Sequence, residues 1–146
     1  MNLDSISETC LGKLAARLPS DLAWVKLLKA SAKAVFLRRR VVGGRRVAFP
    51  GLGDAVFERF YAPGPGPEEV LVEARFTAIS PGTERAYYLN LPNFRHEFPF
   101  FPGYSGAGMV KAVGRGEKDF QVGERVVGIL KHASASIVAV SDLVRL

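Results

Sequence analysis

EVLVEARFTAI, the sequence of residues 69–79, alternates between two kinds of side chain. Successive side chains of a β-strand point to opposite faces of a sheet, so this period of two indicates a strand with one buried face. One face of the strand is predicted to carry Val70, Val72, Ala74, Phe76 and Ala78. The segment is the most regularly patterned strand of the chain, and the remaining elements are predicted around it.

Short strand candidates, separated by Gly and Pro turns, lie on both sides of this segment. They are residues 46–49, 55–61, 108–113, 125–130 and 135–140. The run Pro63-Gly64-Pro65-Gly66-Pro67 excludes regular structure immediately before the alternating strand. Five or six short strands with such turns predict a mainly β fold, either a barrel or a sandwich.

Residues 80–102 contain four prolines and are predicted to form a non-regular segment. Its aromatic side chains are too numerous for a plain surface loop, and we expect them to cover a core or to line a cleft. These aromatics are Tyr87, Tyr88, Phe94, Phe98, Phe100 and Phe101. His96, in the same segment, is expected to be a solvated side chain.

The chain before the strands is predicted to be helical. Apolar positions spaced by three and four residues predict a short amphipathic helix over residues 4–18, and a second one from Ser20 or Asp21 to about residue 40. We therefore divide the chain into a basic helical leader, residues 1–43, and a β domain, residues 44–146. Cys10, in the first helix, is expected to be a small buried side chain.

The net charge of +6 is distributed unevenly along the chain. Residues 1–50 carry ten Lys or Arg against three acids, whereas residues 51–146 carry ten against eleven. Residues 51–146 are thus slightly acidic, and we expect no nucleic-acid partner. The basic leader would suit an acidic partner or a membrane surface, but we favour a solvated basic face with the apolar face packed on protein.

Composition limits the class of protein further. A chain of 146 residues matches one ordinary domain, which buries roughly 70% of the surface of its unfolded chain. With 48% hydrophobic and 23% charged residues, it has the composition of a globular protein. One cysteine excludes an internal disulfide and a Cys-rich zinc cluster. No secretory signal is readable, so a cytoplasmic protein is expected.

Five segments of the β domain, in this order, resemble the amino-terminal, GroES-like domain of medium-chain dehydrogenases/reductases. They are Glu68-Glu69-Val70-Leu71-Val72, Ala78-Ile79-Ser80-Pro81-Gly82-Thr83-Glu84, Phe101-Pro102-Gly103-Tyr104-Ser105-Gly106-Ala107-Gly108, Val113-Gly114 and Val122-Gly123-Glu124-Arg125-Val126. The resemblance covers about residues 46–146. It implies a partly open β-barrel that forms the substrate side of an oxidoreductase active cleft.

The same segments depart from the zinc-dependent members of that family. Those members carry a Cys-Gly-Thr-Asp-like segment and a Gly-His-Glu segment, whose side chains bind a catalytic zinc. Here Pro81, or Ser80 with a shift of one, stands for the cysteine, Tyr104 for the histidine and Ser105 for the glutamate. Proline is no ligand and neutral hydroxyls bind Zn²⁺ weakly, so we expect no zinc. His132 matches a His-Ala pair of the family and is interpreted as structural.

Without a metal, a substrate carbonyl has to be polarised by hydrogen-bond donors or by the cofactor itself. Ser80, Thr83, Tyr104 and Ser105 lie in the two segments that resemble the family's active-site loops, and we predict them as catalytic residues. Tyr104 is the first choice as donor or proton relay. The alternative is a tyrosine that only fills the space where the family's metal lies.

The dinucleotide-binding pattern Gly-x-Gly-x-x-Gly is not found in the sequence. In the resembled family a Rossmann domain follows the barrel and holds NAD(P)H. We therefore expect NAD(P)H to bind only where a Rossmann domain is present, in cis or in trans, and the chain alone to be inactive. The other expected partners are a small-molecule substrate and, as the resemblance allows, further copies in a homo-oligomer.

Two hypotheses of different classes follow. In the first, the chain is the substrate-side domain of a zinc-independent NAD(P)(H)-dependent oxidoreductase. In the second, it is a non-catalytic GroES-like binding or scaffold module that docks a partner through its basic helical leader.

Overall fold

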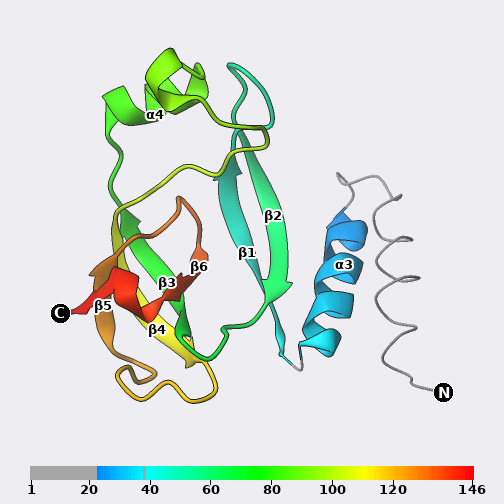
Figure 1. Cartoon of the computed structure of the whole chain (residues 1–146), viewed down its shortest axis with the longest axis vertical. Coiled ribbons are helices and arrows are strands. Elements are labelled where there is room, and N and C mark those ends of the chain that lie inside the picture. The colour runs from blue at the N-terminus through cyan, green and yellow to red at the C-terminus, as the bar shows by residue number, and fades with distance from the viewer. Residues whose placement is uncertain (1–22, 38) are drawn as a thin grey trace. The chain divides into compact units, whose positions relative to one another are not determined.

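The computed structural model describes residues 23–37 and 39–146 (Figure 1). The chain divides into two compact units: one comprises residues up to Gly43 together with Phe60–Gly64, and the other comprises Gly44–Arg59 and Pro65–Leu146. The helix predicted over residues 4–18, including Cys10, lies outside the described residues. The predicted domain boundary after residue 43 stays a prediction.

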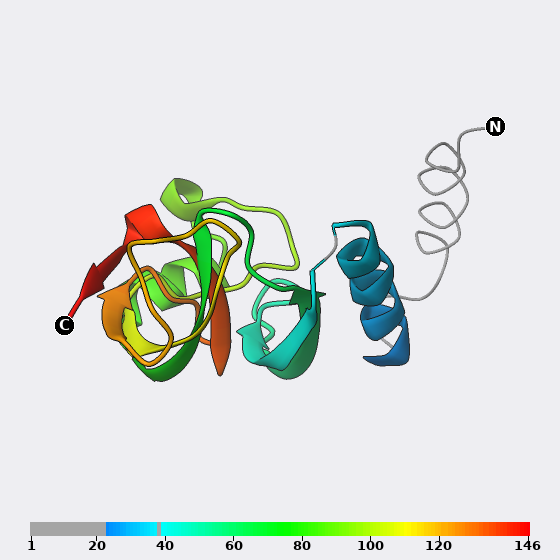
Figure 2. The ribbon, with the colours of Figure 1, turned by 90° about the horizontal axis from the view of Figure 1, so that it is seen from below.

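The second unit is built on a five-stranded antiparallel sheet with the order β6-β3-β4-β5-β7. Its strands are β3 (Glu69–Thr77), β4 (Gly106–Val113), β5 (Arg125–Gly128), β6 (Ala135–Ala139) and β7 (Leu143–Arg145). Figure 2 shows these strands curving round one another. The prediction of a mainly β fold with a partly open barrel is confirmed, and β7 is a strand that the sequence did not reveal.

One face of β3 supplies the centre of the core. Val70 pairs with Val113 and Val138, and Val72 pairs with Val110, so branched side chains meet across three strands. The buried cluster consists of Val70, Val72, Val110, Val126, Leu130, Val138 and Leu143. The alternating pattern of residues 69–79 therefore identified the inward face of the first half of the strand correctly.

The second half of β3 departs from that pattern. Register shifts against β4 occur between Leu71 and Val72 and between Ala74 and Phe76. A bulge adds one unpaired residue and changes which face the following side chains occupy. Phe76 is consequently 77% exposed, although the sequence placed it on the same face as Val70 and Val72.

The two-stranded ribbon of β1 (Val41–Ala48) and β2 (Val56–Pro63) contributes residues to both units. The predicted start of the first strand at residue 46 was wrong, because the strand already begins at Val41 and runs through Gly43 and Gly44. A Cβ at Gly43 would lie 2.9 Å from the Tyr61 ring, so here glycine permits close pairing of strands instead of ending one.

The first unit also contains α3 (Ala23–Phe36), within the second predicted helix. Val25, Ala30 and Ala34 are buried, whereas Trp24, Leu28, Val35 and Phe36 are more than half exposed. Among the described helices, none is both long enough and apolar enough to cross a membrane.

Residues 80–102 are more regular than predicted. They contain the helix α4 (Pro81–Tyr88) and a 3-10 turn, η1 (Pro92–Phe94). Pro81 occupies the first turn of α4, where its fixed φ suits a helix and its missing N–H has no intrahelical partner to lose. The proline that suggested a loop is therefore a helix start.

Aromatic side chains of residues 80–102 pack against Phe49, which is buried, as expected for aromatics that cover a core. Phe49 of the second unit forms a β-bridge with Phe100 and packs edge-on against Tyr88, with 5.5 Å between ring centroids. His96 lies 4.3 Å from the Phe100 ring, and its Nδ1 donates to the Phe94 carbonyl at 2.9 Å. The prediction of a solvated His96 was wrong because the aromatic rings enclose its imidazole.

Candidate functional site

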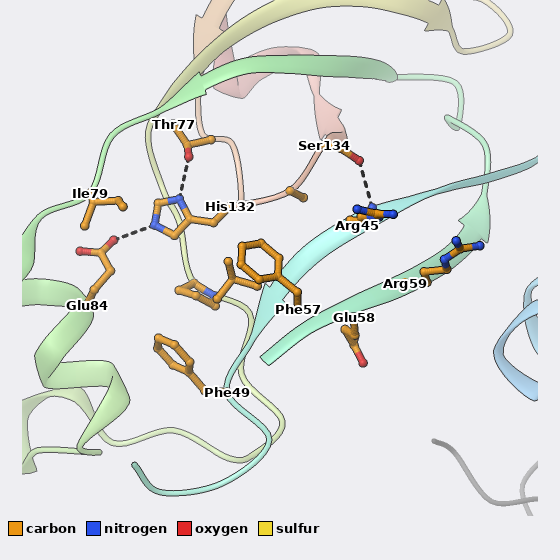
Figure 3. A pocket seen from close by; sticks show the side chains of 13 residues that line it. Arg45, Phe49, Phe57, Glu58, Arg59, Thr77, Ile79, Glu84, His132 and Ser134 are labelled. Carbon is orange, nitrogen blue, oxygen red and sulfur yellow. Dashed lines mark hydrogen bonds and ion pairs between the residues drawn. The ribbon is translucent and has the colours of Figure 1, made fainter. Parts of the chain in front are cut away.

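The second unit contains a cavity of about 950 Å³, a volume within the range of small-molecule binding sites. Figure 3 shows the side chains that line it. They are Arg45, Val47, Phe49, Phe57, Glu58, Arg59, Thr77, Ile79, Glu84, Pro102, His132, Ala133 and Ser134. Seven of these side chains are polar or charged and six are apolar, although most of the exposed wall is apolar. Such a wall suits an organic molecule that carries polar groups.

His132 is fixed in this cavity by its own backbone. Its N–H donates to the Pro102 carbonyl at 2.9 Å, and its carbonyl accepts from the Val47 N–H at 2.8 Å. Gly103, next to Pro102, has a φ of +102°, and a Cβ there would lie 2.7 Å from the Lys131 carbonyl carbon. Only glycine allows both this backbone conformation and this close approach, so the loop of Gly103 sets where His132 stands.

Both ring nitrogens of His132 have a partner. Nε2 lies 3.1 Å from Glu84 Oε1, and Nδ1 lies 2.9 Å from Thr77 Oγ1 (Figure 3). A carboxylate only accepts hydrogen bonds, so Nε2 carries a proton and donates it to Glu84. In the neutral ring Nδ1 then accepts from the Thr77 hydroxyl, and in the charged ring it donates to that oxygen.

The His132–Glu84 pair is largely shielded from water, since the two side chains are only 8% and 13% exposed. The second carboxylate oxygen, Glu84 Oε2, accepts from the Ser80 backbone N–H at 2.9 Å. Glu84 thus joins the first turn of α4 to the imidazole. The result is a hydrogen-bonded series, Thr77–His132–Glu84, in which Thr77 also lines the cavity.

The four predicted hydroxyl residues lie in two neighbouring segments, the start of α4 and the loop before β4. Ser80 Oγ donates to Thr83 Oγ1 at 3.1 Å, and the Ala78 N–H donates to the Ser105 carbonyl at 3.0 Å. Tyr104 is 44% exposed. The structure therefore brings Ser80 and Thr83 together and ties the two segments to each other, but the cavity lining includes none of the four.

The residues at the family's zinc positions do not fit a zinc ion. Pro81 begins α4 and has no donor atom, and Tyr104 and Ser105 offer only hydroxyls. Over residues 23–37 and 39–146, no three or more His, Cys, Asp or Glu side chains are grouped so as to hold a metal ion. The donor chemistry thus disagrees with the zinc centre of the resembled enzymes.

Sequence reasoning missed several residues of the cavity. His132 was interpreted as structural, and Arg45, Arg59 and Thr77 were not considered for a site. Glu84 lies one residue after Thr83 in the predicted loop, yet its carboxylate was given no role. A signal was available for His132, which is one of only two histidines and lies shortly before β6.

Charge in the rest of the lining is partly neutralised. Arg46 pairs with Glu58, with 2.7 Å between Nη2 and Oε1, and its guanidinium stacks 3.5 Å from the centroid of the Phe101 ring. The Arg45 N–H donates to Ser134 Oγ at 3.0 Å, which fastens β1 to the segment after His132.

The sequence model of the alcohol dehydrogenase GroES-like domain matches residues 66–139 of the chain. A comparison with curated protein sequences finds no match.

Three crystal structures show the extent of the likeness to known folds. A quinone oxidoreductase of Pseudomonas syringae pv. Tomato DC3000 is 28% identical with a TM-score of 0.58, over 70% of this chain and 33% of that one. The Escherichia coli quinone oxidoreductase complexed with NADPH is 23% identical with a TM-score of 0.61, over 70% and 33%. The human synaptic vesicle membrane protein VAT-1 homolog-like protein is 19% identical with a TM-score of 0.63, over 71% and 35%. The matched part thus spans about a third of each of these structures.

Proposed function

Because the chain belongs to the alcohol dehydrogenase GroES-like domain family, we propose that it is the substrate-side domain of a zinc-independent, NAD(P)(H)-dependent medium-chain oxidoreductase. A Rossmann domain, in cis or in trans, holds NAD(P)H in the proposed enzyme, and the bound cofactor supplies the hydride. The domain by itself is catalytically incomplete. A cytoplasmic location is part of the same proposal.

The observation that carries the proposal is the Thr77–His132–Glu84 series at the wall of a largely apolar cavity. When a carbonyl or quinone substrate is reduced by hydride, its oxygen has to gain a proton. Thr77 donates its hydroxyl proton to that oxygen, and His132 Nδ1–H replaces the proton on Thr77. Glu84 stays ionised, orients the ring and stabilises its charged form before the transfer.

Hydrogen bonding replaces the metal in this scheme. A zinc ion would polarise the carbonyl as a Lewis acid, whereas a positioned hydroxyl with a protonated histidine behind it stabilises the same developing negative charge. The His132–Glu84 pair is largely shielded from water, which strengthens the hydrogen bond behind the Thr77 hydroxyl. Tyr104, Ser80, Thr83 and Ser105 remain proposed donors from the sequence, with Tyr104 first among them.

The test is the rate of NADPH oxidation by the intact protein that contains this domain, with quinones and aldehydes as acceptors. Two of the similar structures are quinone oxidoreductases, so quinones come first. Thr77→Val removes the hydroxyl and keeps the shape of the side chain, and we expect kcat to fall about tenfold or more. Ser141→Ala, an exposed change outside the cavity, is the matched control.

His132→Gln should lower kcat at least as much as Thr77→Val, because it removes the source of the proton. Unchanged kcat in both variants, with a fall in Tyr104→Phe, would move the donor role to Tyr104. Unchanged kcat in all three would remove hydroxyl-assisted catalysis from the proposal.

A second candidate function is a binding or scaffold module, and the surface of α3 favours it. Trp24, Val35 and Phe36 are 53%, 78% and 60% exposed on a helix that also carries Lys26, Lys29 and Lys33. A partner with an apolar and acidic surface would fit this helix. Loss of partner capture in a Trp24→Ser/Phe36→Ser variant, together with no NADPH oxidation by the intact protein, would favour the module.

A further inference from the structure

Two arginines line the cavity without an ion pair in the part of the chain that the structure describes. They are Arg45 of β1 and Arg59 of β2, and both side chains are exposed. Figure 3 shows them beside each other on neighbouring strands, on the opposite side of the lining from the His132–Glu84 pair. Arg46 follows Arg45 in β1, and it is instead paired with Glu58 of β2.

The carboxylates of the lining are already engaged. Glu58 Oε1 accepts from Arg46 Nε at 2.8 Å, and Glu84 binds His132 and the Ser80 N–H. Neither carboxylate is therefore a ready counter-charge for Arg45 or Arg59. The arginine side of the cavity carries excess positive charge, and that charge lies next to apolar side chains such as Phe57.

We propose that this cavity selects a substrate with an anionic group, a carboxylate or a phosphate, which binds Arg45 and Arg59. Guanidinium groups recognise such oxygens through paired, charge-assisted hydrogen bonds. The uncharged body of the substrate lies along Val47, Phe57 and Ile79, and its reducible oxygen reaches Thr77. The last point rests on the proposed function, whereas anion binding by the two arginines does not.

The arrangement separates two tasks by position. The arginines hold a permanent charge, which fixes the orientation of the substrate and excludes molecules that lack the charge. Thr77 and His132 act on the oxygen that gains a proton. A neutral substrate of the same shape leaves both guanidinium groups without a partner in a partly apolar site, so it is expected to bind more weakly.

The direct test is isothermal titration calorimetry on the 146-residue chain with naphthoate, naphthyl phosphate and the neutral isostere naphthamide. We expect both anions to bind more tightly than the amide. Arg45→Gln and Arg59→Gln should each weaken anion binding about tenfold, since each removes charge-assisted hydrogen bonds. Arg115→Gln, an exposed substitution in the turn after β4, is the matched control and should leave binding unchanged.

The anions' advantage should also shrink as salt rises from about 0.05 M to about 0.5 M, because exposed charges are screened. A preference for the phosphate or for the carboxylate identifies the group that the arginines recognise, and either preference supports the proposal. Equal binding of naphthamide and naphthoate, or unchanged binding in the Arg45→Gln/Arg59→Gln double variant, overturns it.

Activity of the intact protein distinguishes this inference from the function on which it partly rests. If NADPH oxidation occurs equally with neutral and anionic acceptors and ignores both arginine changes, the inference fails and the oxidoreductase function stands. If the anions bind as expected but no acceptor is reduced, the oxidoreductase function fails and the anion site stands.

Discussion

Gly103→Ala should destabilise the barrel far more than an equivalent change at another glycine of the same conformation. Gly103 has a φ of +102° and lies against the backbone of Lys131 and His132. Gly116 has a φ of +99°, but a Cβ there would meet no atom within 4 Å. Comparing the two alanine variants therefore separates backbone strain, which they share, from the close approach to His132, which only Gly103 has.

The structure sets the magnitudes. Placing a non-glycine residue at such a φ costs about 1–3 kcal/mol in both variants. At Gly103 the new Cβ would be 2.7 Å from the Lys131 carbonyl carbon and 2.8 Å from its Cα, so backbone has to move. The movement breaks the 2.9 Å bond from the His132 N–H to Pro102 and loosens the neighbouring bond to Val47. The lost hydrogen bonds and packing should therefore lower the free energy of unfolding of Gly103→Ala by about 2 kcal/mol beyond the strain.

Urea denaturation of the two variants, followed by circular dichroism, measures this difference. Gly116→Ala should lower the free energy of unfolding by the strain alone, and Gly103→Ala by about 2 kcal/mol more. Equal losses in the two variants would refute the argument that Gly103 is there to let the chain pass close to His132.

Other predictions concern the core, the surface charges and the donor. Leu130 is fully buried, so Leu130→Ala should lower the free energy of unfolding by about 2–5 kcal/mol. Leu52 is 68% exposed, and Leu52→Ala should change this free energy little. Equal effects in urea titrations would contradict the assigned core. The hydrogen bond from Lys111 holds the pKa of Glu73 below its ordinary value, so Lys111→Gln should raise that pKa. The chemical shift of the Glu73 carboxyl carbon during a pH titration measures the change, and an unchanged midpoint would contradict the pairing. Tyr104→Phe in the intact protein should reduce turnover about tenfold if Tyr104 is a donor, and leave it unchanged if Thr77 alone has that role.

The sequence predicts those parts of the fold that depend on local patterns. The alternation of residues 69–79 identified β3 and its inward valines, because a period of two is a property of the strand itself. It could not show that Phe76 faces outward, since the bulges beside Ala74 arise from pairing with β4. The helix α4 was missed because residues 81–88 lack an apolar stripe at helical spacing and begin with a proline.

The candidate site was predictable only as a neighbourhood. A backbone hydrogen bond from Ala78 to Ser105 joins the segments that hold Ser80 and Tyr104, whereas the catalytic role of these residues stays a prediction. The pairing of His132 with Glu84 spans 48 positions in the chain, and no periodicity reports a contact at that distance. The two arginines belong to strands whose facing partners are set by tertiary packing, so their place in the cavity emerged only from the structure.

We propose that the active cleft, of which this domain forms one side, works without a metal. The most direct test is the rate of NADPH oxidation by the intact protein after treatment with a strong chelator, measured with and without added Zn²⁺. We predict the same rate in both conditions. A rate that disappears with the chelator and returns with stoichiometric Zn²⁺ would instead show that the cleft needs the metal.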